Sequence, residues 1–175
     1  MSKKYLFITC GFPFSGKTTL VNVIRKEFGL PIVDLDIINK ERNIGINGEK
    51  ISDSKWVETY KISYERTRRL LIGHTSVIYD ATNFTIEQRK VLIDIAEENE
   101  VIPVLLLTDI NEVEARKRLL CNRETNARYD VRDDDFDYVV SRFEKPSIDE
   151  AKVLNYKSSD DVDKWINSYI RPLLS

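Results

Sequence analysis

The chain has 175 residues, of which 42% are hydrophobic and 32% charged, a composition typical of one globular domain with its own core. Its formal net charge of −2 gives no overall attraction to nucleic acid or to an anionic membrane surface. Two cysteines and one histidine exclude a disulfide framework and a His/Cys metal cluster, and no apolar run approaches the ~20 residues that span a bilayer. We therefore expect a single cytoplasmic domain over residues 1–175, with no membrane partner.

The first predicted element is a buried strand at Tyr5–Cys10, which leads directly into the sequence GFPFSGKT at residues 11–18. This is the pattern G-x-x-x-x-G-K-T of the P-loop. A helix-like run at residues 20–28 follows, so the motif lies in the strand–loop–helix context that it requires. The loop therefore predicts a site for nucleotide phosphates.

The chemistry of this loop assigns roles to its residues. Glycines let successive backbone N–H groups turn inward toward phosphate oxygens, and the following helix adds its positive N-terminal dipole. We expect Lys17 to reach the β- and γ-phosphates of ATP, and the Thr18 hydroxyl to hold Mg²⁺. The predicted nucleotide-binding residues are Gly11, Phe14, Ser15, Gly16, Lys17, Thr18 and Thr19.

Strands and helices then alternate along the chain, with Gly29 as the expected C-cap of the P-loop helix. Most of the strands are continuously apolar, which favours a parallel sheet covered by helices on both faces. Thr85 and Gln88 have the spacing of a capping box. The expected strands are 31–36, 76–80, 101–107 and 152–156, and the expected helices are 54–72, 85–99, 111–121, 135–143 and 160–170.

Aspartates end two of these strands, at Asp36 and Asp80, and Asp109 follows the strand at 101–107. Ligands of parallel α/β sheets lie beyond the carboxyl ends of the strands, so these carboxylates should converge near the P-loop. Either Asp80 or Asp109 could hold Mg²⁺, and the residues alone do not decide between them. Asp36 is the candidate general base that would take a proton from an acceptor hydroxyl. The alternative for each is a helix N-cap.

Two further groups of side chains have less specific patterns. Arg123 and Arg128 lie in a polar segment at about 122–135 that joins two helices, where they could form a lid over transferring phosphate or a solvated surface. Trp56, Tyr60 and Tyr64 recur on one face of the 54–72 helix. We interpret these rings as core rather than as a stacking platform.

With these residues identified, the chain resembles, over nearly its whole length, the P-loop kinases of the polynucleotide kinase-like and zeta-toxin-like group. The P-loop is shared by many families, but its combination with D-x-T-N and F-E-x-P is much narrower. The matching segments are GFPFSGKTT at 11–19, Asp36, DATN at 80–83 followed by Arg89, the arginine-bearing lid from Arg123 to Arg132, and RFEKP at 142–146.

The resemblance implies a five-stranded sheet in the order 2-3-1-4-5 and transfer of the ATP γ-phosphate to a hydroxyl. The acceptor would be a polynucleotide 5′-OH, or alternatively a sugar, nucleoside or antibiotic. The resemblance also implies that Asp36 is the base, that Arg123 and Arg128 are catalytic together with Lys17, and that Asp80 rather than Asp109 serves the metal.

One departure weakens the case for a nucleic-acid acceptor. Polynucleotide kinases have an arginine three residues after the base, whereas this chain has Asn39 there and Arg42 one turn further on. A function of another class, a nucleotide-dependent switch or regulatory ATPase, is also compatible with the P-loop. However, the chain lacks D-x-x-G, and its NKER at 39–42 lacks the aspartate of the guanine motif N-K-x-D.

Overall fold

The computed structural model describes residues 3–45, 49–73, 76–127 and 130–175. Of the residues singled out above, Arg128 lies outside the described residues. Among the residues that are described, no helix is both long and apolar enough to cross a membrane.

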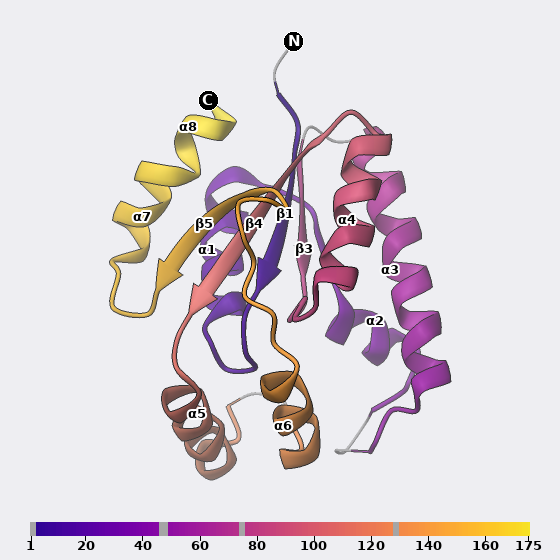
Figure 1. Cartoon of the computed structure of the whole chain (residues 1–175), viewed down its shortest axis with the longest axis vertical. Coiled ribbons are helices and arrows are strands. Elements are labelled where there is room, and N and C mark those ends of the chain that lie inside the picture. Colours follow the sequence, from indigo (N-terminus) through magenta and orange to yellow (C-terminus); the bar gives the residue numbers. More distant parts are fainter. Residues whose placement is uncertain (1–2, 46–48, 74–75, 128–129) are drawn as a thin grey trace.

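A five-stranded sheet, parallel throughout, forms the centre of the molecule (Figure 1). Its strand order is β2-β3-β1-β4-β5, which confirms the expected P-loop kinase-type fold. The P-loop strand is therefore central, with β3 on one side and β4 on the other. The strands are β1 (Tyr5–Cys10), β2 (Ile32–Asp34), β3 (Ser76–Asp80), β4 (Ile102–Asp109) and β5 (Lys152–Lys157).

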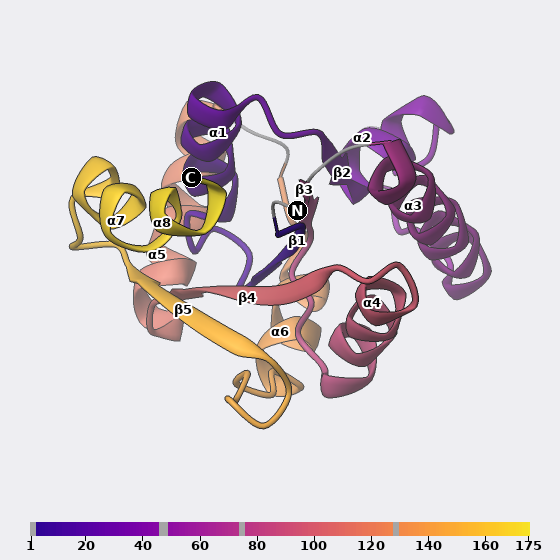
Figure 2. The same ribbon diagram turned by 90° about the horizontal axis from the view of Figure 1, so that it is seen from above.

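Helices cover both faces of the sheet, with α3 and α4 on one face and α1, α7 and α8 on the other (Figure 2). The sheet has a hydrophobic core on each face, because successive side chains of a strand point to opposite faces. In β1, Leu6 and Ile8 pack toward α3 and α4, whereas Phe7 packs toward α1. The described helices are α1 (Lys17–Phe28), α2 (Leu35–Glu41), α3 (Asp53–Gly73), α4 (Ile86–Glu98), α5 (Glu112–Thr125), α6 (Asp133–Ser141), α7 (Val162–Tyr169) and α8 (Arg171–Leu174).

The second strand corrects one prediction. It ends at Asp34, because the Asp34 carboxylate accepts hydrogen bonds from the backbone N–H groups of Asp36 (2.7 Å) and Ile37 (3.2 Å) and so caps α2. The prediction that Asp36 ends this strand is therefore wrong. Asp36 lies instead in the first turn of α2, so the N-cap of this helix is Asp34 and not Asp36.

Other helix ends agree with the sequence. Gly29 has the left-handed conformation (φ 66°) of a C-cap, and Thr85 forms the expected capping box with Gln88. The segment at 122–135 is partly helical rather than irregular, since α5 continues to Thr125 and α6 begins at Asp133.

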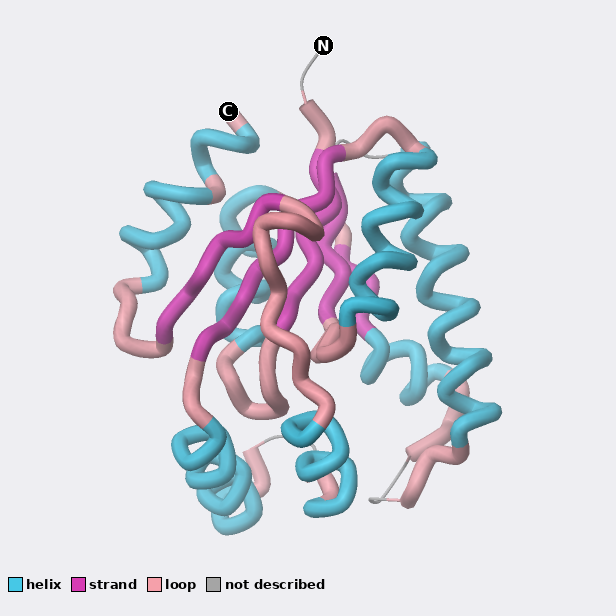
Figure 3. Tube along the Cα trace, viewed as in Figure 1, coloured by secondary structure: helices cyan, strands magenta, loops and turns pink. Residues whose placement is uncertain are grey.

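Helices α5 and α6 lie beyond the carboxyl ends of the strands, at the lower end of the molecule in Figure 3. A small separate core holds them together through Leu119 of α5 and Phe136 of α6. Phe12 and Phe14 of the P-loop pack against this same core. The lid region and the phosphate loop are thus in direct apolar contact.

Candidate active site

Glycine is required at the start of the P-loop by both conformation and space. Gly11 has φ 149°, and a Cβ added there would lie 2.3 Å from the Thr108 hydroxyl oxygen and 2.9 Å from the Thr108 carbonyl oxygen. Phe14 (φ 62°) and Gly16 (φ 103°) are also in left-handed conformations, which turn the backbone back on itself. The loop is therefore a tight turn seated against the end of β4.

Lys17 is held inside this turn. Its ammonium donates hydrogen bonds to the carbonyl oxygens of Phe12 (2.7 Å) and Gly11 (3.1 Å) and to the hydroxyl of Ser15 (3.5 Å), and the residue is buried. The Ser15 and Thr108 hydroxyl oxygens are 2.5 Å apart, and Thr108 also donates to the Cys10 carbonyl (3.2 Å). Thr108 of β4 therefore supports the loop, a role that sequence analysis missed because the two hydroxyls are 93 residues apart.

The N-terminus of α1 is suited to binding an anion. The helix begins at Lys17, three residues earlier than expected, and its N-cap Gly16 supplies no side-chain hydrogen bond. By contrast, side chains cap α2, α4, α5 and α7. The N-cap residue of α1 therefore places no side chain over the first turn, and Thr18 and Thr19 are exposed there.

Asp80 is the buried carboxylate beside this loop. The Thr9 hydroxyl donates a hydrogen bond to it (3.0 Å), and Asp80 lies opposite Asp34 in the pairing of β2 with β3. Burial raises the pKa of Asp80 to about 6, and the negative charges of Asp34 and Asp36 add to this rise, while the charge of Lys17 opposes it. The carboxylates of Asp34, Asp36 and Asp80 therefore interact electrostatically with one another, and those of Asp36 and Asp80 also interact with the Lys17 ammonium.

Asp109, the alternative metal carboxylate, has other partners. It forms an ion pair with Lys145 (2.8 Å) and accepts a hydrogen bond from the Asn155 amide (3.3 Å), and these contacts lower its pKa. Of the two candidates, Asp80 is the one within electrostatic reach of Lys17.

Asp36 reaches the same region from α2. Desolvation by the surrounding protein raises its pKa, although the side chain still reaches solvent, and the negative charge of Asp34 raises it further. Lys17 lowers the pKa of Asp36, so these two groups also interact. Asp36 therefore interacts electrostatically with Lys17 of the P-loop from the first turn of a helix, and not from a strand end.

Comparison with known proteins places this site in a family. Residues 6–146 match a family model described as an AAA domain. The chain belongs to this AAA domain family. No curated protein matches this AAA domain.

Solved structures of similar fold include three that cover almost all of this AAA domain. A protein from Chloroflexus aurantiacus, described as a candidate kinase, is 19% identical with a TM-score of 0.73, and 98% of each chain is covered. Kti12 from Chaetomium thermophilum in complex with ADP-AlF3 is 17% identical with a TM-score of 0.78, covering 97% of this chain and 99% of that one. The APS kinase of Mycobacterium tuberculosis in complex with AMPPNP and APS is 14% identical with a TM-score of 0.69, over 100% of both chains. At these low sequence identities, the comparison shows a shared fold only.

In this AAA domain, Asn39 and Arg42 join α2 to α3. The Asn39 side-chain oxygen accepts a hydrogen bond from the Thr59 hydroxyl (2.6 Å). Arg42 donates to the Lys55 carbonyl (2.8 Å) and to Thr59, and it forms an ion pair with Glu58. Asn39 and Arg42, the two residues at which the chain differs from the polynucleotide kinase pattern, therefore both bind side chains or backbone of α3.

Of the two arginines expected to act in a lid, Arg123 is described, and it is paired with acidic side chains. Arg123 bridges Asp130 and Asp133, each at 3.0 Å, and donates to the Val131 carbonyl (2.9 Å). It therefore holds together the connection between α5 and α6.

Arg118 on α5, to which sequence analysis gave no role, contacts the P-loop. It donates to the Phe14 carbonyl (3.4 Å), and its guanidinium lies 4.0 Å from where a Cβ on Gly16 would be. It also forms an ion pair with Glu114 at 2.9 Å. The sequence shows three consecutive basic residues, Arg116, Lys117 and Arg118, but it does not show which of them faces the P-loop.

The side chains present fit Mg²⁺. This ion prefers oxygen ligands and is usually held by one or two carboxylates together with substrate phosphates. The Thr18 hydroxyl and the Asp80 carboxylate are donors of that kind. Within the described ranges, no group of three His, Cys, Asp or Glu residues could hold a metal ion by itself. The donors therefore suit an ion that arrives with the nucleotide.

Proposed function

We propose that this AAA domain is an ATP-dependent kinase that transfers the γ-phosphate of ATP to a hydroxyl group of an acceptor. The observation that carries the proposal is the position of Lys17, inside a P-loop and within electrostatic reach of both Asp80 and Asp36. A phosphate-binding loop beside two carboxylates supplies a metal ligand and a separate base, which a hydroxyl kinase requires. Structures of the same fold include kinases, which supports this reading.

In this proposal the P-loop backbone and the first turn of α1 hold the phosphates. Lys17 exchanges its hydrogen bonds with the loop carbonyls for bonds with β- and γ-phosphate oxygens. The nucleotide-contacting residues would be Gly11, Phe14, Ser15, Gly16, Lys17, Thr18 and Thr19. Thr18 and Asp80 would hold Mg²⁺, which when bound neutralises charge on the phosphates.

Asp36 would receive the proton of the acceptor hydroxyl. Burial and the negative charge of Asp34 raise the pKa of Asp36, which makes it a stronger base than an ordinary aspartate. Arg123 and Arg128 would stabilise charge on the transferring phosphoryl group. For Arg123 this requires exchange of Asp130 and Asp133 for phosphate oxygens.

The proposal is tested by following the label of γ-labelled ATP over a panel of sugars, nucleosides and 5′-hydroxyl oligonucleotides. We expect acceptor-dependent transfer, and a loss of ~10²-fold or more in Lys17→Ala, as for removal of one charged transition-state contact. Lys26→Ala, which changes an exposed lysine of the same helix, is the control and should be unaffected. ATP hydrolysis that no acceptor stimulates would favour the regulatory ATPase and overturn the kinase proposal.

A further inference from the structure

Aromatic rings from three parts of the chain, α3, α6 and the segment before α4, are linked through Gln88. The ring centroids of Trp56 and Tyr60 on α3 are 6.0 Å apart, and those of Phe84 and Tyr138 are 5.9 Å apart. Gln88 joins the two pairs, because its amide nitrogen donates to the Tyr60 hydroxyl (3.1 Å) and its oxygen accepts from the Phe84 N–H (3.0 Å). Burial is the main cause of the raised pKa of Tyr60, and the Tyr64 and Tyr138 phenols add to it, so Tyr60 and Tyr138 are in electrostatic reach. We call Trp56, Tyr60, Phe84 and Tyr138 the aromatic cluster.

The aromatic cluster is not a closed core. Tyr138 is 49% exposed, and Trp56 and Tyr60 are only partly buried, whereas Phe84 is buried. The interpretation of Trp56 and Tyr60 as core residues is therefore only partly right. Partly exposed aromatic rings offer apolar surface on which another ring can pack.

The aromatic cluster is connected to the proposed base. Phe84 follows directly on the DATN segment that begins at Asp80. Trp56 and Tyr60 lie on α3, which is hydrogen-bonded to α2 through Thr59 and Asn39. Asp36 is in the first turn of that same α2. Figure 1 shows α2 beside the start of α3, and α6 separately at the lower end of the molecule, beyond the strand ends.

The charge around the aromatic cluster is negative. Asp34 raises the pKa of Asp36, and both raise the pKa of Asp80, which reflects crowded negative charge. The three aspartates at the start of α6, 133–135, pair with Arg123 and Arg132 and add little net charge. Arg142 lies over the Tyr138 ring at 4.5 Å, so the excess negative charge is that of Asp34, Asp36 and Asp80 at the Asp36 end of the site. This field repels a polyanion and favours a neutral or positively charged molecule.

We propose that the acceptor is a small ring-bearing molecule without phosphate groups, whose ring stacks on the aromatic cluster and whose reactive hydroxyl lies at Asp36. The inference rests on the proposed kinase function and names its substrate class. In the reaction, the acceptor oxygen forms a bond to the γ-phosphorus while the bond from that phosphorus to the β–γ bridging oxygen breaks. ADP leaves with that electron pair, and the hydroxyl proton passes to the Asp36 carboxylate.

Matched acceptors test the charge requirement. Adenosine and adenosine 3′-monophosphate share a 5′-hydroxyl, and glucose and glucose 1-phosphate share a 6-hydroxyl, so each pair differs only by a phosphate. We expect kcat/KM for transfer from γ-labelled ATP to favour the uncharged member of the active pair by roughly tenfold or more, because like charges across a binding site are repelled. Preference for the phosphorylated member, or for a 5′-hydroxyl oligonucleotide, would overturn this inference and leave the kinase function standing. Hydrolysis of ATP without transfer to any acceptor would remove both.

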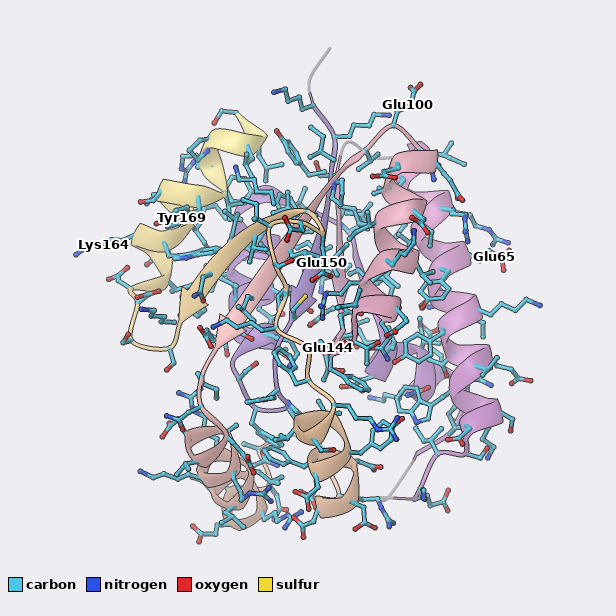
Figure 4. The ribbon with its side chains drawn as sticks, viewed as in Figure 1. Glu65, Glu100, Glu144, Glu150, Lys164 and Tyr169 are labelled. Carbon is cyan, nitrogen blue, oxygen red and sulfur yellow. The ribbon has the colours of Figure 1, made fainter. Side chains whose placement is uncertain are left out.

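A matched pair of tyrosine variants tests the aromatic cluster. Tyr138 and Tyr169 are each 49% exposed and each contacts another ring, but Tyr169 lies on α7 at the opposite side of the molecule (Figure 4). With the best uncharged acceptor, Tyr138→Ala should raise the acceptor KM roughly tenfold, as for loss of one stacking partner. The KM for ATP should not change, and Tyr169→Ala should alter neither constant. An unchanged acceptor KM in Tyr138→Ala, or a parallel rise in the KM for ATP, would exclude the aromatic cluster from the acceptor site.

Discussion

Arg89 and Glu150 form a two-bond ion pair across 61 residues of sequence, with the arginine completely buried. The two hydrogen bonds are 2.7 and 2.9 Å long, and a third from Arg89 reaches the Asn83 carbonyl at 3.0 Å. The Asn83 amide in turn donates to the Thr9 carbonyl of β1 (2.7 Å). The pair therefore joins α4, the loop after Asp80 and the segment that returns from α6 to β5, on which Figure 4 labels Glu150.

Glu144, also labelled in Figure 4, reinforces this connection. Its carboxylate accepts a hydrogen bond from the Ile86 N–H at the start of α4 (2.8 Å), and its own N–H donates to the Phe84 carbonyl (2.8 Å). These bonds give a physical reason for the F-E-x-P motif, because its glutamate fixes the segment that follows the lid onto the loop that follows Asp80.

We predict that Glu150→Gln lowers the free energy of unfolding by about 3 kcal/mol, because it leaves the Arg89 guanidinium buried without its counter-charge. The control is Asp94→Asn, which breaks the exposed Lys90–Asp94 pair of the same helix and should cost about 0.5 kcal/mol or less. Urea unfolding of the three proteins measures both values. Equal small losses in the two variants would show that the buried pair contributes no more than a surface pair.

We predict that Asp36→Asn keeps its affinity for ATP and loses transfer by ~10²–10⁴-fold, as expected for removal of a general base. Asp34→Ala should instead lower stability by about 1 kcal/mol, because it removes the side-chain cap of α2. Equilibrium nucleotide binding, single-turnover transfer and thermal unfolding separate the two effects. A loss of nucleotide affinity in Asp36→Asn equal to its loss of transfer would identify Asp36 as a metal or structural residue.

Asp80 should make the nucleotide-free protein less stable as pH rises. Its pKa is about 6 in the folded chain and about 4 when unfolded, so the folded state binds this proton more tightly and ionisation opposes folding. Asp80→Asn should therefore gain stability over the wild type between about pH 4 and pH 6 and keep a gain on the order of 2 kcal/mol above that range. The same variant should lose Mg²⁺-dependent transfer. Denaturant titrations from pH 4 to 8 provide the measurement, and an Asp80→Asn protein less stable than wild type at pH 7 would contradict the prediction.

Arg118 should support nucleotide binding through its contact with the P-loop. We expect Arg118→Ala to raise the KM for ATP several-fold, because a cation beside Phe14 and Gly16 is lost from a site for phosphates. Lys117→Ala is the matched control, since Lys117 is the exposed preceding cation on α5. Steady-state kinetics with ATP as the varied substrate measure this KM. If Arg118→Ala and Lys117→Ala have the same KM for ATP, Arg118 makes no specific contribution to nucleotide binding.

The sequence by itself determined the phosphate loop and the type of sheet. Both are local properties: the P-loop depends on glycines, a lysine and a threonine at fixed spacing, and the parallel sheet depends on strands that are apolar on both faces. Helix ends at Gly29 and Thr85 were predictable for the same reason, because a cap is formed by neighbouring residues. The strand order followed from resemblance to known kinases rather than from any periodicity in the chain.

Only the tertiary structure decided which polar groups meet. The sequence around Asp34 and Asp36 is compatible with a strand or a helix, and the choice depends on where one carboxylate meets two backbone N–H groups. Asp80 and Asp109 have similar local sequences, but Lys145, 36 residues further on, pairs with Asp109, whereas Asp80 lies within reach of Lys17. Such contacts join residues far apart in the chain, and the spacing of side chains along a sequence does not record the distances between strands and helices once they have packed.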